Sequence, residues 1–186
     1  MTRYIALLRA VNVGGTGKLP MADLKALCAQ LGFARIETYI ASGNVVFDAE
    51  LAAGKVRALL EKGLLALAGK GIDTFVRTAA EMRSVLTSNP FKDKEPRLTY
   101  AFFLHDKPRS DALNDVRGRV GEEIHLGSRE IYVYYPAGMG QSKLRIPAAA
   151  GAGTARNMKT VEKLAEMASG RRITDPATSS NAPRAG

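Results

Sequence analysis

The stretch that decides the fold is residues 4–13, Tyr4-Ile-Ala-Leu-Leu-Arg-Ala-Val-Asn-Val13, which runs into the glycine turn Gly14-Gly15-Thr16-Gly17-Lys18. This stretch is almost free of charge and rich in Ile, Leu and Val, which predicts a strand buried on both faces. Such a strand belongs in the middle of a sheet. Polar groups gather only at its end, as Arg9, Asn12 and the glycines, where a ligand can reach backbone amides.

The elements that follow complete a known supersecondary unit. Helical spacing of apolar residues predicts helices over residues 20–31 and 51–67, and alternation predicts strands over 34–41, 45–47 and 72–77. The resulting order β-α-β-β-α-β is the split βαβ, or ferredoxin-like, unit, also called an alpha-beta plait. A right-handed crossover then places the first strand between the third and the fourth.

The second half of the chain repeats β-α-β-β-α without close sequence similarity. After a helix over 79–88 we predict strands over 98–104, 122–126 and 130–135, with helices over 111–120 and 155–168, the last capped by Thr154. We therefore expect an α+β protein of two ferredoxin-like halves that share a core, residues 1–78 and 79–170. Residues 171–186 lack apolar periodicity and are expected to form a disordered tail.

Composition indicates an ordinary globular protein. The chain has 186 residues, of which 46% are apolar and 24% charged, so its core needs no metal or disulfide staple. No apolar run is long enough for a membrane helix or a signal peptide, and we expect a cytoplasmic protein without membrane contact. The lone Cys28 lies on the apolar side of a predicted helix, which indicates a buried, reduced thiol.

The charge pattern favours weak nucleic-acid binding at most. The net charge of +9 divides into +4 for residues 1–90, +3 for 91–170 and +2 for 171–186, so no basic patch stands out. Tyr100 and Phe102 share a strand face, as do Tyr132 and Tyr134, at the positions from which RNA-recognition modules stack bases. The RNP1 pattern is absent, and packing of these aromatic residues on the other half is the favoured interpretation.

Two glycine-flanked helix starts are candidate anion sites. The turn after the first strand fails as a P-loop and as a dinucleotide fingerprint, yet Lys18 beside free amides leaves an anion site open. The approach to the last helix carries Arg156, which either binds a phosphate or carboxylate or is a solvated side chain beside an N-cap. His105 and His125 have no metal-ligand spacing, and no metal or cofactor is predicted.

Arg9 and Arg156 are both awkwardly placed, and one negative partner would explain both. Arg9 interrupts a buried strand, and Arg156 is predicted at the helix end that disfavours a positive charge. The partner is a ligand, or an acidic side chain such as Asp23 or Glu37. The hypothesis is a single anion-binding cleft in which Arg156 and Asn157 lie near Arg9 and Asn12.

Several short motifs follow one another along the chain in a characteristic order and spacing. They are residues 4–15, Met21-Ala-Asp-Leu24, Gly32-Phe33, Thr38-Tyr39, Ser42-Gly-Asn-Val-Val-Phe47, Asn89-Pro-Phe91, Ser142-Lys143, Thr154-Ala-Arg-Asn157 and Thr160-Val161. With these motifs the chain resembles the bacterial domain-of-unknown-function family 1697 over about residues 4–168. The resemblance implies a cytoplasmic protein of two alpha-beta plait halves, and it implies no activity. Met158 stands where the family usually carries Trp.

These observations predict a protein that binds a phosphorylated small molecule, a nucleotide or a nucleic acid through one cleft. Two alternatives stay open: an enzyme of unknown reaction that uses the same cleft, and a protein-interaction module. The sequence identifies no catalytic residue and predicts no oligomeric state. The candidate ligand-binding residues are Arg9, Asn12, Gly14, Gly15, Lys18, Ser42, Asn44, Lys143, Thr154, Arg156 and Asn157.

Overall fold

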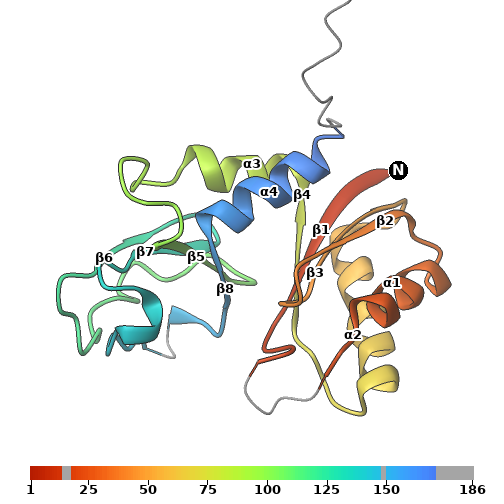
Figure 1. Cartoon of the computed structure of the whole chain (residues 1–186), viewed down its shortest axis with the longest axis horizontal. Coiled ribbons are helices and arrows are strands. Elements are labelled where there is room, and N and C mark those ends of the chain that lie inside the picture. Colours follow the sequence, from red (N-terminus) through yellow and green to blue (C-terminus); the bar gives the residue numbers. More distant parts are fainter. Residues whose placement is uncertain (14–17, 148–149, 171–186) are drawn as a thin grey trace, which may run out of the picture.

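The computed structural model describes residues 1–13, 18–147 and 150–170, which form two antiparallel sheets of four strands each (Figure 1). The first sheet has the order β2-β3-β1-β4, so β1 lies between β3 and β4 as the crossover rule predicts. Its outer face is covered by two helices, α1 and α2. The bounds are β1 (Thr2–Leu8), α1 (Met21–Gln30), β2 (Ala34–Tyr39), β3 (Asn44–Ala49), α2 (Ala53–Ala68) and β4 (Thr74–Thr78).

The strand β1 is buried on both faces, because its two sets of alternating side chains enter two different cores. Tyr4 and Leu8 pack with the residues of α1 and α2, whereas Ile5 and Leu7 face the second half of the molecule. The strand ends at Leu8, earlier than its apolar run predicts. Beyond it, left-handed backbone angles turn the chain.

The second sheet has the order β6-β7-β5-β8, which repeats the arrangement of the first. Helices α3 and α4 follow the equivalent strands β4 and β8, and they pack against each other along one side of both sheets (Figure 1). The remaining bounds are α3 (Ala79–Thr87), β5 (Thr99–Phe103), β6 (Glu123–Leu126), β7 (Glu130–Tyr134), a 3-10 turn η1 (Met139–Gln141), β8 (Thr154–Asn157) and α4 (Met158–Ala168).

Two predicted helices differ from the structure. No helix forms over residues 111–120: residues 111–115 are turns and Arg117 makes an isolated bridge to Arg145, in a stretch where Asn114, Asp115 and Gly118 all disfavour helix interiors. Residues 154–157 form the short strand β8, and the helix begins only at Met158. Its N-cap is Asn157, whose side chain accepts a hydrogen bond from the Thr160 amide, and not Thr154 as predicted.

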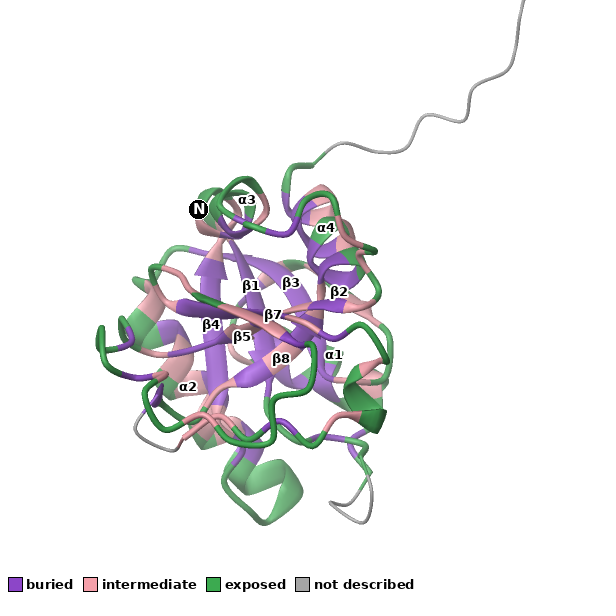
Figure 2. Cartoon of the chain, turned by 90° about the vertical axis from the view of Figure 1, so that its left-hand side faces the viewer, coloured by how far each residue is buried: buried purple, intermediate pink, exposed green. Residues whose placement is uncertain are grey.

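The two sheets share one hydrophobic core, which confirms the predicted α+β fold of two ferredoxin-like halves. Ile5, Leu7 and Phe75 of the first half pack in this core with Phe103 and Tyr132 of the second. The strands at the centre of Figure 2 are accordingly mostly buried.

Two predictions about the extent of the fold stay open. The division of the two halves at residue 78 stays a prediction, and the predicted tail lies outside the described residues. Over the described ranges, no helix is both long and apolar enough to span a membrane.

The pair Tyr100 and Phe102 in β5 and the pair Tyr132 and Tyr134 in β7 do not form one stacking platform. In the ladder between β5 and β7, Tyr100 lies opposite Val133, and Ala101 lies opposite Tyr132. The two pairs therefore point to opposite faces of the sheet. Tyr132 is only 1% exposed and donates a hydrogen bond to the Val85 carbonyl, so it packs on the shared core and cannot stack on a base.

Candidate functional site

Two turns at one end of the first sheet lie side by side: residues 9–13 after β1, and residues 40–43 between β2 and β3. We call them the paired turns. Asn12 joins them, since its Nδ2 donates to the carbonyls of Leu19 at 2.9 Å and Ala41 at 2.7 Å. Its Oδ1 accepts from the Leu19 amide at 2.7 Å. Gly43 packs so closely that a Cβ there would overlap Val11.

The paired turns carry backbone strain. Ala10 and Asn12 have φ angles of 52° and 55°, and the β-branched Ile40 has a φ of 48°. Left-handed residues other than glycine cost about 1–3 kcal/mol each and persist only where the surrounding contacts enforce them. Strain of this kind concentrates at ligand sites, which makes the paired turns the candidate functional site.

Arg156 reaches the paired turns from the second half of the molecule. Its Nη2 donates to the carbonyls of Leu8 and Ser42, each at 2.9 Å, and its Nε donates to Asn44 Oδ1 at 2.6 Å. Its Nη1 donates to Thr154 Oγ1 at 2.9 Å and to the Ala155 carbonyl at 2.8 Å. A guanidinium has five N–H donors, and each of them has an acceptor here.

The charge of Arg156 is held by oxygen dipoles. Among the described residues no carboxylate lies within ion-pair distance of it, and burial lowers its pKa to about 10. The sequence argument placed Arg156 in the first turn of a helix and gave it an anionic partner. Instead it lies in a strand and binds carbonyl oxygens. Its donors therefore join the two halves and leave none for a ligand.

The other predicted residues divide into supports and exposed cations. Asn44 is buried, and its Nδ2 donates to the Tyr39 carbonyl and to Ser42 Oγ. Asn157 caps α4 at the other end of β8 from Thr154. Arg9 and Lys18 are exposed, and neither side chain has a hydrogen bond or ion pair within the described parts of the chain. Lys143 is exposed in the loop after η1, and Gly14 and Gly15 lie outside the described residues.

Arg77 is a buried counterpart of Arg156 that the sequence argument missed. It lies in β4, is 1% exposed, and donates from Nη2 to the carbonyls of Leu104 at 2.7 Å and Arg129 at 3.1 Å. Its guanidinium also lies 5.5 Å from the centre of the Phe103 ring. Burial and the nearby Arg129 lower its pKa, and Glu130 partly offsets this. The sequence signal that identifies Arg77 is an Arg directly before a helix N-cap residue, Thr78, because Arg156 and Asn157 repeat this pattern in the second half.

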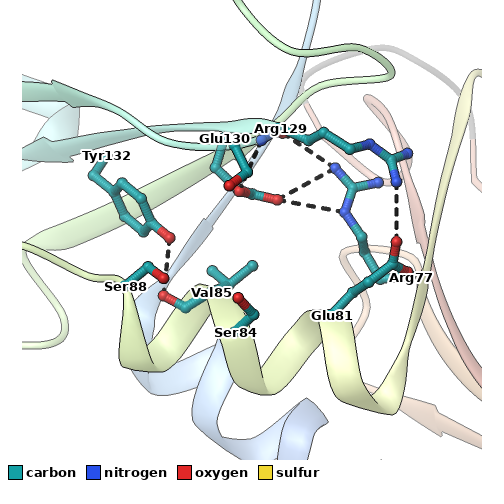
Figure 3. A pocket seen from close by; sticks show the side chains of 9 residues that line it. Arg77, Glu81, Ser84, Val85, Ser88, Arg129, Glu130 and Tyr132 are labelled. Carbon is teal, nitrogen blue, oxygen red and sulfur yellow. Dashed lines mark hydrogen bonds and ion pairs between the residues drawn. The ribbon is translucent and has the colours of Figure 1, made fainter.

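A small pocket opens beside Arg77, between α3 and the start of β7 (Figure 3). Its volume of about 120 Å³ is room for roughly four water molecules. The charges at its wall are already paired, Arg129 with Glu81 at 3.1 Å and Arg77 with Glu130 at 3.5 Å. The pocket is therefore polar and close to neutral, and it offers no free cation to an anionic ligand.

A family model, described as "Protein of unknown function (DUF1697)", matches residues 1–132. The chain belongs to the DUF1697 family. No curated protein matches it at a significant level. Among solved structures, this DUF1697 protein is similar to the conserved bacterial protein SP0830 from Streptococcus pneumoniae, with a TM-score of 0.74 and 23% sequence identity. The similarity covers 90% of this chain and 98% of SP0830, and at that identity it supports the fold alone.

Proposed function

We propose that this DUF1697 protein binds a phosphorylated small molecule or a nucleotide at the paired turns, with Arg9 and Lys18 as the anion-binding side chains. The observation that carries the proposal is the strain of these turns. The paired turns hold three left-handed residues other than glycine, the Asn12 side chain connects the two turns, and Arg156 binds the neighbouring carbonyls of Leu8 and Ser42. Stability alone gives no reason to keep a conformation of this cost.

The exposed residues of the paired turns suit such a ligand. Arg9 offers a fork of donors that matches two phosphate oxygens, and Lys18 adds a second positive charge. The apolar side chains of Val13 and Ile40 are exposed to 51% and 50%. They offer an apolar surface to the rest of the ligand, such as a base or a carbon chain.

The supports of the paired turns would also raise affinity. Because Asn12 and Arg156 already fix the backbone, a ligand would not have to order it on binding. Arg156, Asn44 and Thr154 act here as positioning residues, since they contact the turns and not the ligand. The proposed site therefore stays at the end of the first strand, but these three residues position the turns and do not bind the ligand.

The test is calorimetric titration of the protein with inorganic phosphate, a nucleoside monophosphate and a nucleoside triphosphate. We expect Arg9→Gln and Lys18→Gln each to weaken binding by about tenfold, the usual effect of losing one charge-assisted hydrogen bond. The matched controls are Arg97→Gln and Lys159→Gln, which change exposed cations elsewhere on the surface. No binding of any of the three ligands, or equal binding by all four variants, would contradict the proposal.

A further inference from the structure

We propose that Glu61, Asp73 and His105 form a binding site for a first-row divalent metal ion of the Zn²⁺ class. Each of the three offers one ligand atom, and these atoms all lie within 4.8 Å of one another. The site borders the paired turns, since the Arg9 amide donates to the Asp73 carbonyl at 2.9 Å, and it joins the two halves of the molecule. Glu61 comes from α2 and Asp73 directly precedes β4, whereas His105 follows β5.

The three side chains are held in place by their surroundings. His105 Nε2 lies 2.7 Å from Asp73 Oδ1, and the imidazole ring stacks on Phe75 at 4.1 Å with an interplanar angle of 7°. Glu61 Oε1 accepts a hydrogen bond from the Thr74 amide at 3.1 Å. The stacking on Phe75 and the bond from the Thr74 amide orient His105 and Glu61 before the ion arrives, which raises affinity. The bond between His105 and Asp73 joins two of the ligand groups themselves, so the ion must replace it.

The kind of ligand selects the kind of ion. Zn²⁺ binds imidazole nitrogen and carboxylate oxygen at about 2.0–2.2 Å, so two ligand atoms on one ion are separated by no more than about 4.4 Å. Ligand atoms that lie within 4.8 Å of one another have to approach by no more than about 0.4 Å to meet that limit. One nitrogen and two carboxylate oxygens suit Zn²⁺, Mn²⁺ or Co²⁺, whereas Ca²⁺ and Mg²⁺ favour oxygen ligands throughout. Three protein ligands leave room for water or a further ligand on the ion.

A cation already lies between the two carboxylates. Arg57 Nε is 2.8 Å from Glu61 Oε1, and Arg57 Nη2 is 3.6 Å from Asp73 Oδ1. The Arg57 side chain is 39% exposed, so it can swing into solvent when a metal ion takes its place. The metal must therefore compete with Arg57. This gives the proposal an unusual consequence: removing this positive charge should strengthen metal binding.

The test is a titration of the EDTA-treated, full-length protein with Co²⁺, followed by visible absorption and by competition with Zn²⁺. His105→Phe removes the ligand nitrogen but keeps a ring on Phe75, and we expect it to weaken Co²⁺ binding by at least about 100-fold. Asp73→Asn should also weaken it. The matched control is His125→Phe, which changes the other of the two histidines at an exposed position of β6.

Two further measurements separate ligation from a structural role. Zn²⁺ should raise the melting temperature of the wild type and of His125→Phe, because it binds only the folded protein, and should leave that of His105→Phe unchanged. Arg57→Gln should bind Co²⁺ more tightly than the wild type. A wild type without a Co²⁺ spectrum, equal binding by His105→Phe, or weaker binding by Arg57→Gln would each overturn the proposal. Metal is the only ligand used, so failure here leaves the proposed anion binding at Arg9 and Lys18 untouched.

Discussion

Arg77 and Arg156 occupy equivalent positions in the two sheets, and each donates hydrogen bonds into the opposite half of the molecule. Each is the next-to-last residue of its strand, β4 or β8, and each is followed by the N-cap of a helix, α3 or α4, that packs along one side of both sheets. Arg77 reaches carbonyls of the second half, and Arg156 reaches carbonyls of the first. Two reciprocal arginines thus connect the halves at the level of the backbone.

We expect Arg156→Lys to destabilise the protein by about 2–4 kcal/mol. A lysine has three donors on one atom and cannot reach the carbonyls of Leu8 and Ser42 together with Asn44, and a buried acceptor left unpaired costs about 1–3 kcal/mol. Urea unfolding measures the change. The control is Arg145→Lys, at an exposed position, which should change the free energy of unfolding by less than about 0.5 kcal/mol. Equal effects of the two substitutions would contradict this role of Arg156.

Arg77→Met should also destabilise the protein, and Glu130 should be coupled to it. The substitution leaves the Glu130 carboxylate buried without its cation, in addition to the unpaired carbonyls of Leu104 and Arg129. A double-mutant cycle with Glu130→Gln should therefore give a coupling energy of about 1 kcal/mol or more. Additive effects would mean that the ion pair at 3.5 Å contributes nothing.

We expect the Asn12→Gly variant to be more stable than the Asn12→Ala variant. Both substitutions remove the bonds to Leu19 and Ala41, but Ala must also adopt the φ of 55°, which costs a residue with a Cβ about 1 kcal/mol more than Gly. We expect Asn12→Ala to have the lower free energy of unfolding by that amount in urea. The control is Asn114→Ala, in an exposed turn, which should change the free energy of unfolding by less than about 0.5 kcal/mol. A more stable Asn12→Ala would show that the strain at this position is absent in solution.

Cys28 should make the protein less stable as the pH rises from 9 to 10. Burial raises the pKa of its thiol from 9.0 to about 12, so above pH 9 the unfolded chain releases a proton that the folded chain keeps. The unfolded state then binds fewer protons, and the free energy of unfolding falls by up to about 1.4 kcal/mol per pH unit. In Cys28→Ala this part of the slope should vanish. An unchanged slope would mean that the thiol ionises in the folded protein.

The first half of the fold follows from its sequence, and the second half only in part. The uninterrupted apolar residues of β1 indicate a central strand, and the structure agrees. The second half is harder to predict because β8 has four residues and no apolar alternation, and because residues 111–120, predicted as a polar helix, form turns and an isolated bridge. Short elements of this kind are fixed by their neighbours, here by pairing of β8 with β5.

The candidate site shows a different limit of sequence reasoning. The contacts of Asn12, Ser42, Asn44, Thr154 and Arg156 connect the end of β1 with β8, whereas Asn157, which the single-cleft hypothesis also placed there, caps α4 instead. The expected partner of Arg156 was wrong, because its acceptors are mostly carbonyls, which every residue has and no sequence pattern marks. The sequence shows no metal-ligand spacing around His105 for a related reason: 32 positions separate it from Asp73, and only the packing of the two halves brings the two side chains together.

The central claim is that the reciprocal arginines and the shared core make the two halves one cooperative unit. Native-state hydrogen exchange of the amides of Ala6 in β1 and Ala101 in β5, the central strands of the two sheets, tests it most directly. We predict that both amides exchange by global unfolding, with the same free energy of opening and the same dependence on urea. An opening free energy lower by more than about 2 kcal/mol at either amide would show that this half unfolds on its own, and would contradict the account.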